Sequence, residues 1–151
     1  MLPFRHGNRK NGCAERQTES NWKEPLTPKA RATAPPANLQ NMIALSIRQP
    51  YVEEILRGIK KIEYRSRLTK IRGRVLIYAA LQPGNLDRFA KLKVEPGDLP
   101  IGVVVGSVEI KACTGTPGDY EWHLEDPIRM ARPKRPRNRP QPGWFYPFRR
   151  P

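Results

Sequence analysis

Apolar residues follow two spacings along the chain, and each spacing predicts a different kind of element. The segment 43–47 alternates apolar with smaller or polar residues, which predicts a half-buried strand. From Pro50 the apolar positions fall three and four residues apart, which predicts a short amphipathic helix that ends at Gly58. Asn85 can cap a second helix, whose apolar side carries Leu86, Phe89 and Leu92.

Further segments have the alternation or the β-branched composition of strands. These predicted strands are 62–64, 74–80, 101–110, 120–124 and 144–148. Gly102 and Gly106 interrupt the richest of them and indicate a bulge or a bend. Alternation turns Tyr64 and Trp122 toward the core and His123 outward. The predicted fold class is α+β, a small mixed or antiparallel β-barrel of five to six strands with two short helices.

The chain divides into a tail and one domain. Residues 1–41 hold seven basic residues, three acidic residues and five prolines without apolar periodicity, which predicts a disordered basic extension. An alternative is that translation naturally begins at Met42 and that residues 1–41 come from an over-extended start. The domain is expected at 42–148, including a basic Pro-rich segment at 129–142, and residues 149–151 form a short tail.

Several classes of protein are disfavoured by the composition. No apolar stretch approaches the ~18 residues that a membrane-spanning helix requires. The N-terminus lacks the apolar core of a secretion signal, so a cytoplasmic location is expected. Cys13 and Cys113 indicate reduced thiols rather than a disulfide framework. Their spacing relative to His6 and His123 does not match a zinc site, so no metal and no cofactor are expected.

Positive charge belongs mainly to the predicted domain. The chain carries a formal charge of +14, and residues 42–151 hold 21 basic against 11 acidic residues. One cluster at 57–74 has eight cations and a single acid, Glu63; a second lies at 129–139 between prolines that keep it extended. Such clusters favour polyanion partners, above all nucleic acid, although solvated charged faces that maintain solubility are the simpler alternative.

Two motifs in the first half of the domain resemble those of a known family. Ser46-Ile-Arg-Gln-Pro-Tyr51 precedes the predicted helix, and Ile55-Leu-Arg-Gly-Ile-Lys-Lys-Ile-Glu-Tyr-Arg65 follows it and enters the next strand. With Arg72-Gly73 they resemble the ASCH domain, named for homology to the activating signal cointegrator, within the PUA-like superfamily. The resemblance extends more weakly through 100–110, 120–124 and 143–146, and so covers the whole predicted domain.

The resemblance implies a PUA-like β-barrel with a helix-bordered cleft, and binding of RNA or other nucleic acid. Some distant relatives hydrolyse modified cytidines with a lysine that matches Lys60 and a threonine at the position of Glu63, and nuclease activity is attributed to others. Glu63 replaces that threonine, which removes the nucleophile. Only Glu109 and Glu121 are candidates for the partner carboxylate.

The leading hypothesis is therefore a monomeric RNA-binding or general nucleic-acid-binding module that recognises its ligand through a basic cleft. The candidate binding residues are Arg48, Tyr51, Lys60, Lys61, Arg65, Arg67, Lys70, Arg72, Lys134, Arg135 and Arg137. One alternative is a small hydrolase, an amidohydrolase or ribonuclease, acting on a modified nucleoside or RNA, with Lys60 and Glu63 as catalytic groups. The two side chains could equally form an ion pair that fixes the turn. A further alternative is a protein-interaction adaptor that binds acidic partners.

Ser46 and His123 are weaker candidates for a hydrolytic site. A serine nucleophile needs a base, and no histidine lies near Ser46 in sequence. His123 is the one domain histidine, and alternation places it at the surface.

Overall fold

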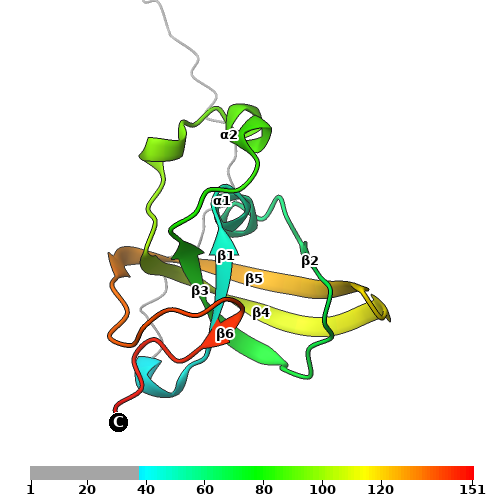
Figure 1. The fold of residues 1–151 in the computed structure, drawn as a ribbon, viewed down its shortest axis with the longest axis vertical. Helices are drawn as coiled ribbons and strands as arrows, with labels where there is room; N and C mark the ends of the chain where they lie inside the picture. Colours follow the sequence, from blue (N-terminus) through cyan, green and yellow to red (C-terminus); the bar gives the residue numbers. More distant parts are fainter. Residues whose placement is uncertain (1–37) are drawn as a thin grey trace, which may run out of the picture.

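Six strands form one mixed sheet in the order β2-β5-β4-β3-β1-β6 in the computed structural model, which describes residues 38–151 (Figure 1). The strands are β1 (Ala44–Arg48), β2 (Ile62–Arg65), β3 (Gly73–Ala80), β4 (Val103–Thr116), β5 (Asp119–Lys134) and β6 (Trp144–Phe145). β1 is parallel to β3, and the other neighbours are antiparallel. Expectations that concern residues 1–37, with His6 and Cys13, lie outside the described residues.

Two α-helices and two 3-10 turns complete the fold. The helices are α1 (Tyr51–Leu56) and α2 (Leu86–Leu92), and the turns are η1 (Leu39–Asn41) and η2 (Pro96–Asp98). As expected, the Asn85 side chain caps α2 by accepting a hydrogen bond from the backbone N–H of Asp87, at 2.8 Å. Helix α1 begins one residue after Pro50, and Gly58 follows it with φ +73°.

The sheet is strongly curled, so that strands far apart in the sheet order meet. Trp122 of β5 stacks on Trp144 of β6 with ring centroids 5.4 Å apart. Arg65 of β2 donates a hydrogen bond of 2.9 Å to the backbone carbonyl of Ser46 in β1. The result is a small half-barrel, which confirms the predicted α+β fold with a mixed sheet and two short helices.

Side chains from both faces of β3 are buried, as its continuous apolar run predicts. Leu45, Val52, Ile77, Val108 and Trp122 belong to the larger core cluster, between the curled sheet and α1. A smaller cluster on the other face contains Leu76, Tyr78 and Phe145. These two clusters hold the strands that carry the cleft described below.

The β4–β5 hairpin is longer than the sequence predicts. Both strands continue beyond 101–110 and 120–124, and β5 absorbs the first part of the basic Pro-rich segment. Pro127 fits because it lies at an irregularity, where the register shifts between Ser107 and Glu109 of β4. Gly106 also lies at a register shift, as expected, and a Cβ there would collide with the carbonyl of Ile128.

Two further expectations require correction. Tyr64 is not a core residue, because 58% of it is exposed while its neighbour Glu63 is buried. Alternation shows that every second residue of a strand shares a face, but it does not show which of the two faces is turned inward. In β2 the inward face carries Glu63, whose carboxylate pairs with Lys60 and Arg65. The closing strand is also shorter than 144–148, since only Trp144 and Phe145 pair with β1.

Within residues 38–151, no helix is long and apolar enough to cross a membrane. The same residues include no group of three or more His, Cys, Asp or Glu side chains that could hold a metal ion.

Candidate functional site

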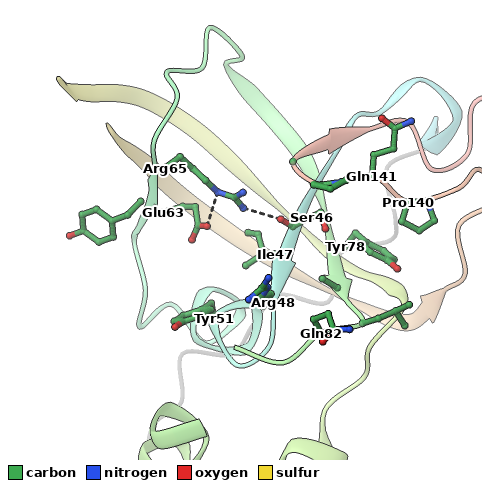
Figure 2. A pocket seen from close by; sticks show the side chains of 15 residues that line it. Ser46, Ile47, Arg48, Tyr51, Glu63, Arg65, Tyr78, Gln82, Pro140 and Gln141 are labelled. Carbon is green, nitrogen blue, oxygen red and sulfur yellow. Dashed lines mark hydrogen bonds and ion pairs between the residues drawn. The ribbon is translucent and has the colours of Figure 1, made fainter. Parts of the chain in front are cut away.

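A cleft of about 610 Å³ opens where β1, β2 and the segment before β6 meet (Figure 2). We call it the main cleft. Its lining comes from β1 and the start of α1, from Glu63, Tyr64 and Arg65 of β2, from the end of β3 and the residues that follow it, and from the segment 140–143. The curl of the sheet brings these parts together, because it returns β2 toward β1.

A smaller cavity of about 550 Å³, the side pocket, adjoins the main cleft. Tyr51, Glu63 and Tyr64 line both cavities. The rest of the side pocket is formed by Glu54, the segment 59–62 and Arg88. The α1–β2 turn and α2 therefore build this part of the site.

The carboxylate of Glu63 lies between two cations. Its Oε1 accepts a hydrogen bond of 3.0 Å from Nε of Arg65, and its Oε2 lies 3.4 Å from Nζ of Lys60. Nζ of Lys60 also donates to the carbonyl of Ile62, at 2.5 Å. Glu63 thus orients both cations at the boundary between the main cleft and the side pocket.

Two tyrosine rings border the same cations. Nζ of Lys60 lies 5.8 Å from the ring centroid of Tyr51 and 5.2 Å from that of Tyr64. The guanidinium of Arg88 lies 5.3 Å from the Tyr51 centroid. These distances suit cation–π attraction. Tyr64 remains largely exposed, so its ring is accessible to a ligand.

Hydrogen bonds from Gln49 fix the start of α1 and so the position of Tyr51. Gln49 is 1% exposed; its side-chain amide donates to the carbonyl of Pro100 and its side-chain oxygen accepts from the backbone N–H of Glu53. Its backbone carbonyl accepts from the N–H of Gly84. A Cβ on Gly84 would lie 2.6 Å from Cε2 of Tyr51, so only glycine lets this loop approach the ring.

The cap on α2 and a buried carboxylate position Arg88. Glu54 is 5% exposed and its Oε1 accepts a hydrogen bond of 3.1 Å from Nε of Arg88. Oε2 of Glu54 has no hydrogen-bond partner among residues 38–151. The contact holds the guanidinium of Arg88 against Tyr51 rather than letting it extend into solvent.

Polar and apolar side chains together line the rest of the main cleft. Arg48 and Ser46 come from β1, Gln82 follows β3 and Gln141 comes from the segment before β6 (Figure 2). Tyr78 also lines the cleft, and burial raises the pKa of its hydroxyl above its usual 10.0. Tyr78 therefore offers the cleft a neutral hydroxyl that can donate or accept a hydrogen bond.

The structure brings together six of the candidate residues from the sequence. Those that line the main cleft or the side pocket are Arg48, Tyr51, Lys60, Lys61, Glu63 and Arg65. Lys70 and Arg72 instead line a separate cavity of about 500 Å³ beside Cys113, and the side chain of Arg67 is exposed.

The second basic cluster is divided among different environments. Lys134, Arg135 and Arg137 border a cavity of about 410 Å³ with Leu39 and Phe148. Arg129 is not displayed for an external partner, because its guanidinium binds Glu53 in α1. The segment 140–143, immediately after this cluster, does reach the main cleft.

Of the other hydrolytic candidates, Ser46 lines the main cleft, which Lys60 does not border. His123 forms a 2.8 Å hydrogen bond with Thr114 Oγ1; it borders a further cavity of about 550 Å³ together with Lys60, but it lines neither the main cleft nor the side pocket. Glu109 and Glu121 line none of the described cavities that Lys60 borders. The proposed partner carboxylate of an amidohydrolase is therefore not supplied by either residue.

Several residues of the site are not indicated by the sequence. These are Arg88, Glu54, Tyr78, Gln82 and Gln141. Arg88 lies three residues after the cap Asn85, but nothing in the sequence indicates that α2 packs near Tyr51. Glu54 gives no such signal either, because an amphipathic helix is expected to expose its charged residues, whereas the structure buries this one.

The curled mixed sheet and its helix-bordered cleft define the PUA-like class of small β-barrel domains. A family model for the ASCH domain matches residues 45–138, which is most of the described chain. The chain belongs to the ASCH domain family.

Individual proteins are similar to this chain to different extents. Activating signal cointegrator 1 from Homo sapiens is 31% identical over 80 residues, which cover 46% of this chain and 14% of that protein. The chain thus corresponds to a small part of that relative. The structure of ASCH from Zymomonas mobilis is 17% identical with a TM-score of 0.44, and the match covers 64% of this chain and 74% of that one. A mutant of the Zymomonas mobilis protein gives 17% identity and a TM-score of 0.49 over 71% of this chain and 88% of that one.

Proposed function

We propose that this ASCH domain binds single-stranded RNA in the main cleft and the side pocket. The observation that carries the proposal is the convergence of Tyr51, Tyr64 and the Glu63 carboxylate around the ammonium of Lys60, at the boundary of two open cavities. Exposed aromatic rings next to cations are typical of surfaces on which unpaired bases stack while the backbone phosphates are neutralised.

The charges around the site support a polyanionic ligand. Five cations line the main cleft and the side pocket, namely Arg48, Lys60, Lys61, Arg65 and Arg88, against the two acids Glu54 and Glu63. Both acids are buried and hydrogen-bonded by cations of the site, so the exposed surface is positive. RNA binding is also the common theme of the PUA-like group to which the family is related.

The remaining basic residues extend the positive surface in this account. Arg67, Lys70 and Arg72 follow β2, and Lys134, Arg135 and Arg137 precede the segment 140–143 that lines the main cleft. They would contact phosphates outside the cleft without reading bases.

The salt dependence of binding tests this proposal. Each phosphate contact with a single strand contributes a slope of about −0.7 to a plot of log K against log salt, so contacts to phosphates within the cleft and beside it predict a clearly negative slope. Fluorescence anisotropy with a labelled single-stranded RNA at several salt concentrations measures this slope. An affinity that is independent of salt, or no binding at low salt, would contradict the proposal.

A second candidate function is hydrolysis of RNA or of a modified nucleoside, favoured by the 3.4 Å approach of Lys60 to Glu63 at an accessible cleft. The ammonium of Lys60 already donates to the carbonyl of Ile62 and faces Glu63, so it offers a positive charge to a ligand more readily than it offers a base. Incubation with acetylated cytidine and with single-stranded RNA tests the candidate, and the binding account predicts no turnover of either. Turnover that Lys60→Ala abolishes and Lys91→Ala preserves would establish the hydrolase instead.

A further inference from the structure

The boundary between the main cleft and the side pocket suggests how much RNA the site holds. The two cavities have similar volumes, about 610 and 550 Å³, and each is within the ~300–1,000 Å³ that small-ligand pockets occupy. Tyr51, Glu63 and Tyr64 are common to both linings and form the wall between them. A third cavity of about 550 Å³ shares Lys60, Lys61 and Ile62 with the side pocket, but it is lined by Glu125 and Asp126 and by no arginine, which does not suit an anionic ligand. The site therefore has two adjoining places for a ligand group of comparable size.

Each cavity contributes its own cation to that wall. Arg65 lines the main cleft and not the side pocket, whereas Lys60 lines the side pocket and not the main cleft. Both bind the carboxylate of Glu63 between them, at 3.0 and 3.4 Å. Two cations around one anion leave the wall with a net positive charge, which suits a phosphodiester that crosses it.

Each cavity also contains a guanidinium with free hydrogen-bond donors. Arg48, in the main cleft, forms no side-chain hydrogen bond or ion pair with any residue of 38–151, and it is exposed. Arg88, in the side pocket, uses Nε to bind Glu54, and its two terminal nitrogens form no hydrogen bond with those residues. A single nucleoside in one cavity would leave the other cavity and its arginine unused.

We infer that the site takes two successive nucleotides of single-stranded RNA, with one base in each cavity and the linking phosphodiester at the wall near Lys60 and Arg65. The inference rests on the proposed function and adds its unit of recognition, which is a dinucleotide step rather than a free nucleoside. Tyr64 lies at the wall with 58% of its surface exposed and offers its ring to a base on either side.

Affinities for uridine 5′-monophosphate, the dinucleotide pUpU, the trinucleotide pUpUpU and a longer oligouridylate test the inference. Because a second base adds a stacking contact, the dinucleotide should bind about 10-fold more tightly than the mononucleotide. The gain in affinity from the dinucleotide to the trinucleotide should be clearly smaller than the gain from the mononucleotide to the dinucleotide. Equal affinities for mono- and dinucleotide while the oligouridylate binds would overturn the inference and leave the proposed function standing. Failure of every probe to bind would overturn both.

Two matched variants provide a second criterion. Arg48→Gln and Arg88→Gln should each weaken dinucleotide binding, since each removes the free guanidinium of one cavity. Arg132→Gln, at an exposed position of β5 outside both cavities, is the control and should leave the affinity unchanged. A dinucleotide affinity that is insensitive to either Arg48→Gln or Arg88→Gln would contradict the two-cavity account.

Backbone amide chemical shifts give a readout that does not depend on variants folding. A titration of the unmodified protein with pUpU should shift the amides of both Gln82, in the main cleft, and Ile59, in the side pocket. Shifts confined to one of the two cavities at saturation would overturn the inference.

Discussion

Arg129 of β5 donates hydrogen bonds of 3.0 and 2.9 Å to the two carboxylate oxygens of Glu53 in α1. Glu53 is 5% exposed and also accepts a 2.7 Å hydrogen bond from Arg57, one turn later in the chain. Arg129, which belongs to the second basic cluster in the sequence, therefore links the β4–β5 hairpin to α1 through an ion pair, and we call this contact the tie. Because α1 begins at Tyr51, this tie also holds one wall of the proposed RNA site.

Arg129→Gln should destabilise the domain. Loss of one partner from a buried ion pair costs about 3–5 kcal/mol, whereas exposed pairs contribute about 0–1 kcal/mol. The side chain of Arg129 is 40% exposed and Arg57 remains as a partner, so we expect a loss of about 1–2 kcal/mol in the free energy of unfolding. Urea denaturation measures it. The control Arg132→Gln should change stability by less than about 0.5 kcal/mol, and equal effects of the two variants would contradict the tie.

The same carboxylate makes stability depend on pH. Burial raises the pKa of Glu53, but hydrogen bonds and charges from Arg129 and Arg57 outweigh burial and lower it below the ordinary 4.5. A carboxyl whose pKa is lowered by folding stabilises the folded state above its unfolded pKa, and this contribution is lost as pH falls through the folded pKa. Unfolding free energies between about pH 6 and pH 3 should therefore decline more steeply for the wild type than for Glu53→Gln. If the unfolding free energies of the two proteins decline in parallel as pH falls, Glu53 does not contribute to the pH dependence of stability.

Gly84→Ala should weaken RNA binding by displacing Tyr51. The new Cβ would lie 2.6 Å from Cε2 of that ring and 3.0 Å from the carbonyl of Gln49, so the ring must move. Overpacking of this kind costs up to about 1–3 kcal/mol, and a partly exposed ring that can rotate away reduces the cost. Gly97→Ala is the matched control, because a Cβ there meets nothing within 4 Å. The measurement is the affinity of each variant for single-stranded RNA. Thermal melting of both variants distinguishes displacement of the Tyr51 ring from a general loss of stability. Unchanged RNA affinity in Gly84→Ala would show that Tyr51 is not part of the binding surface.

Local patterns in the sequence predicted most of the fold. Strand β1, helix α1, the doubly buried β3 and the Asn85 cap all depend on spacing within a few residues, which the sequence displays directly. The length of β5 was missed, since Pro127 reads as a strand breaker until the register shift that accommodates it is known. Prolines at such irregularities remove no required hydrogen bond.

The site was less predictable because it is assembled by the curl of the sheet. The motif residues Tyr51, Lys60 and Glu63 lie close in sequence and could be grouped from it. Arg88 and Gln141 reach the same site only through tertiary packing, which no local spacing encodes. The spacing of its strand places Tyr64 on the wrong face, because the neighbouring charged residue, Glu63, turns inward to two cationic partners, Lys60 and Arg65.

The most direct measurement of the central claim compares RNA affinity in Tyr64→Ala and Tyr146→Ala. Both tyrosines are exposed and each has a cation near its ring, Lys60 at 5.2 Å for Tyr64 and Arg149 at 4.4 Å for Tyr146. Tyr64 alone of the two lines the main cleft and the side pocket. Loss of base stacking should weaken binding of single-stranded RNA to Tyr64→Ala by about 5- to 100-fold, with Tyr146→Ala close to wild type. Wild-type affinity in Tyr64→Ala, or an equal loss in both variants, would contradict the assignment of the cleft as the RNA site.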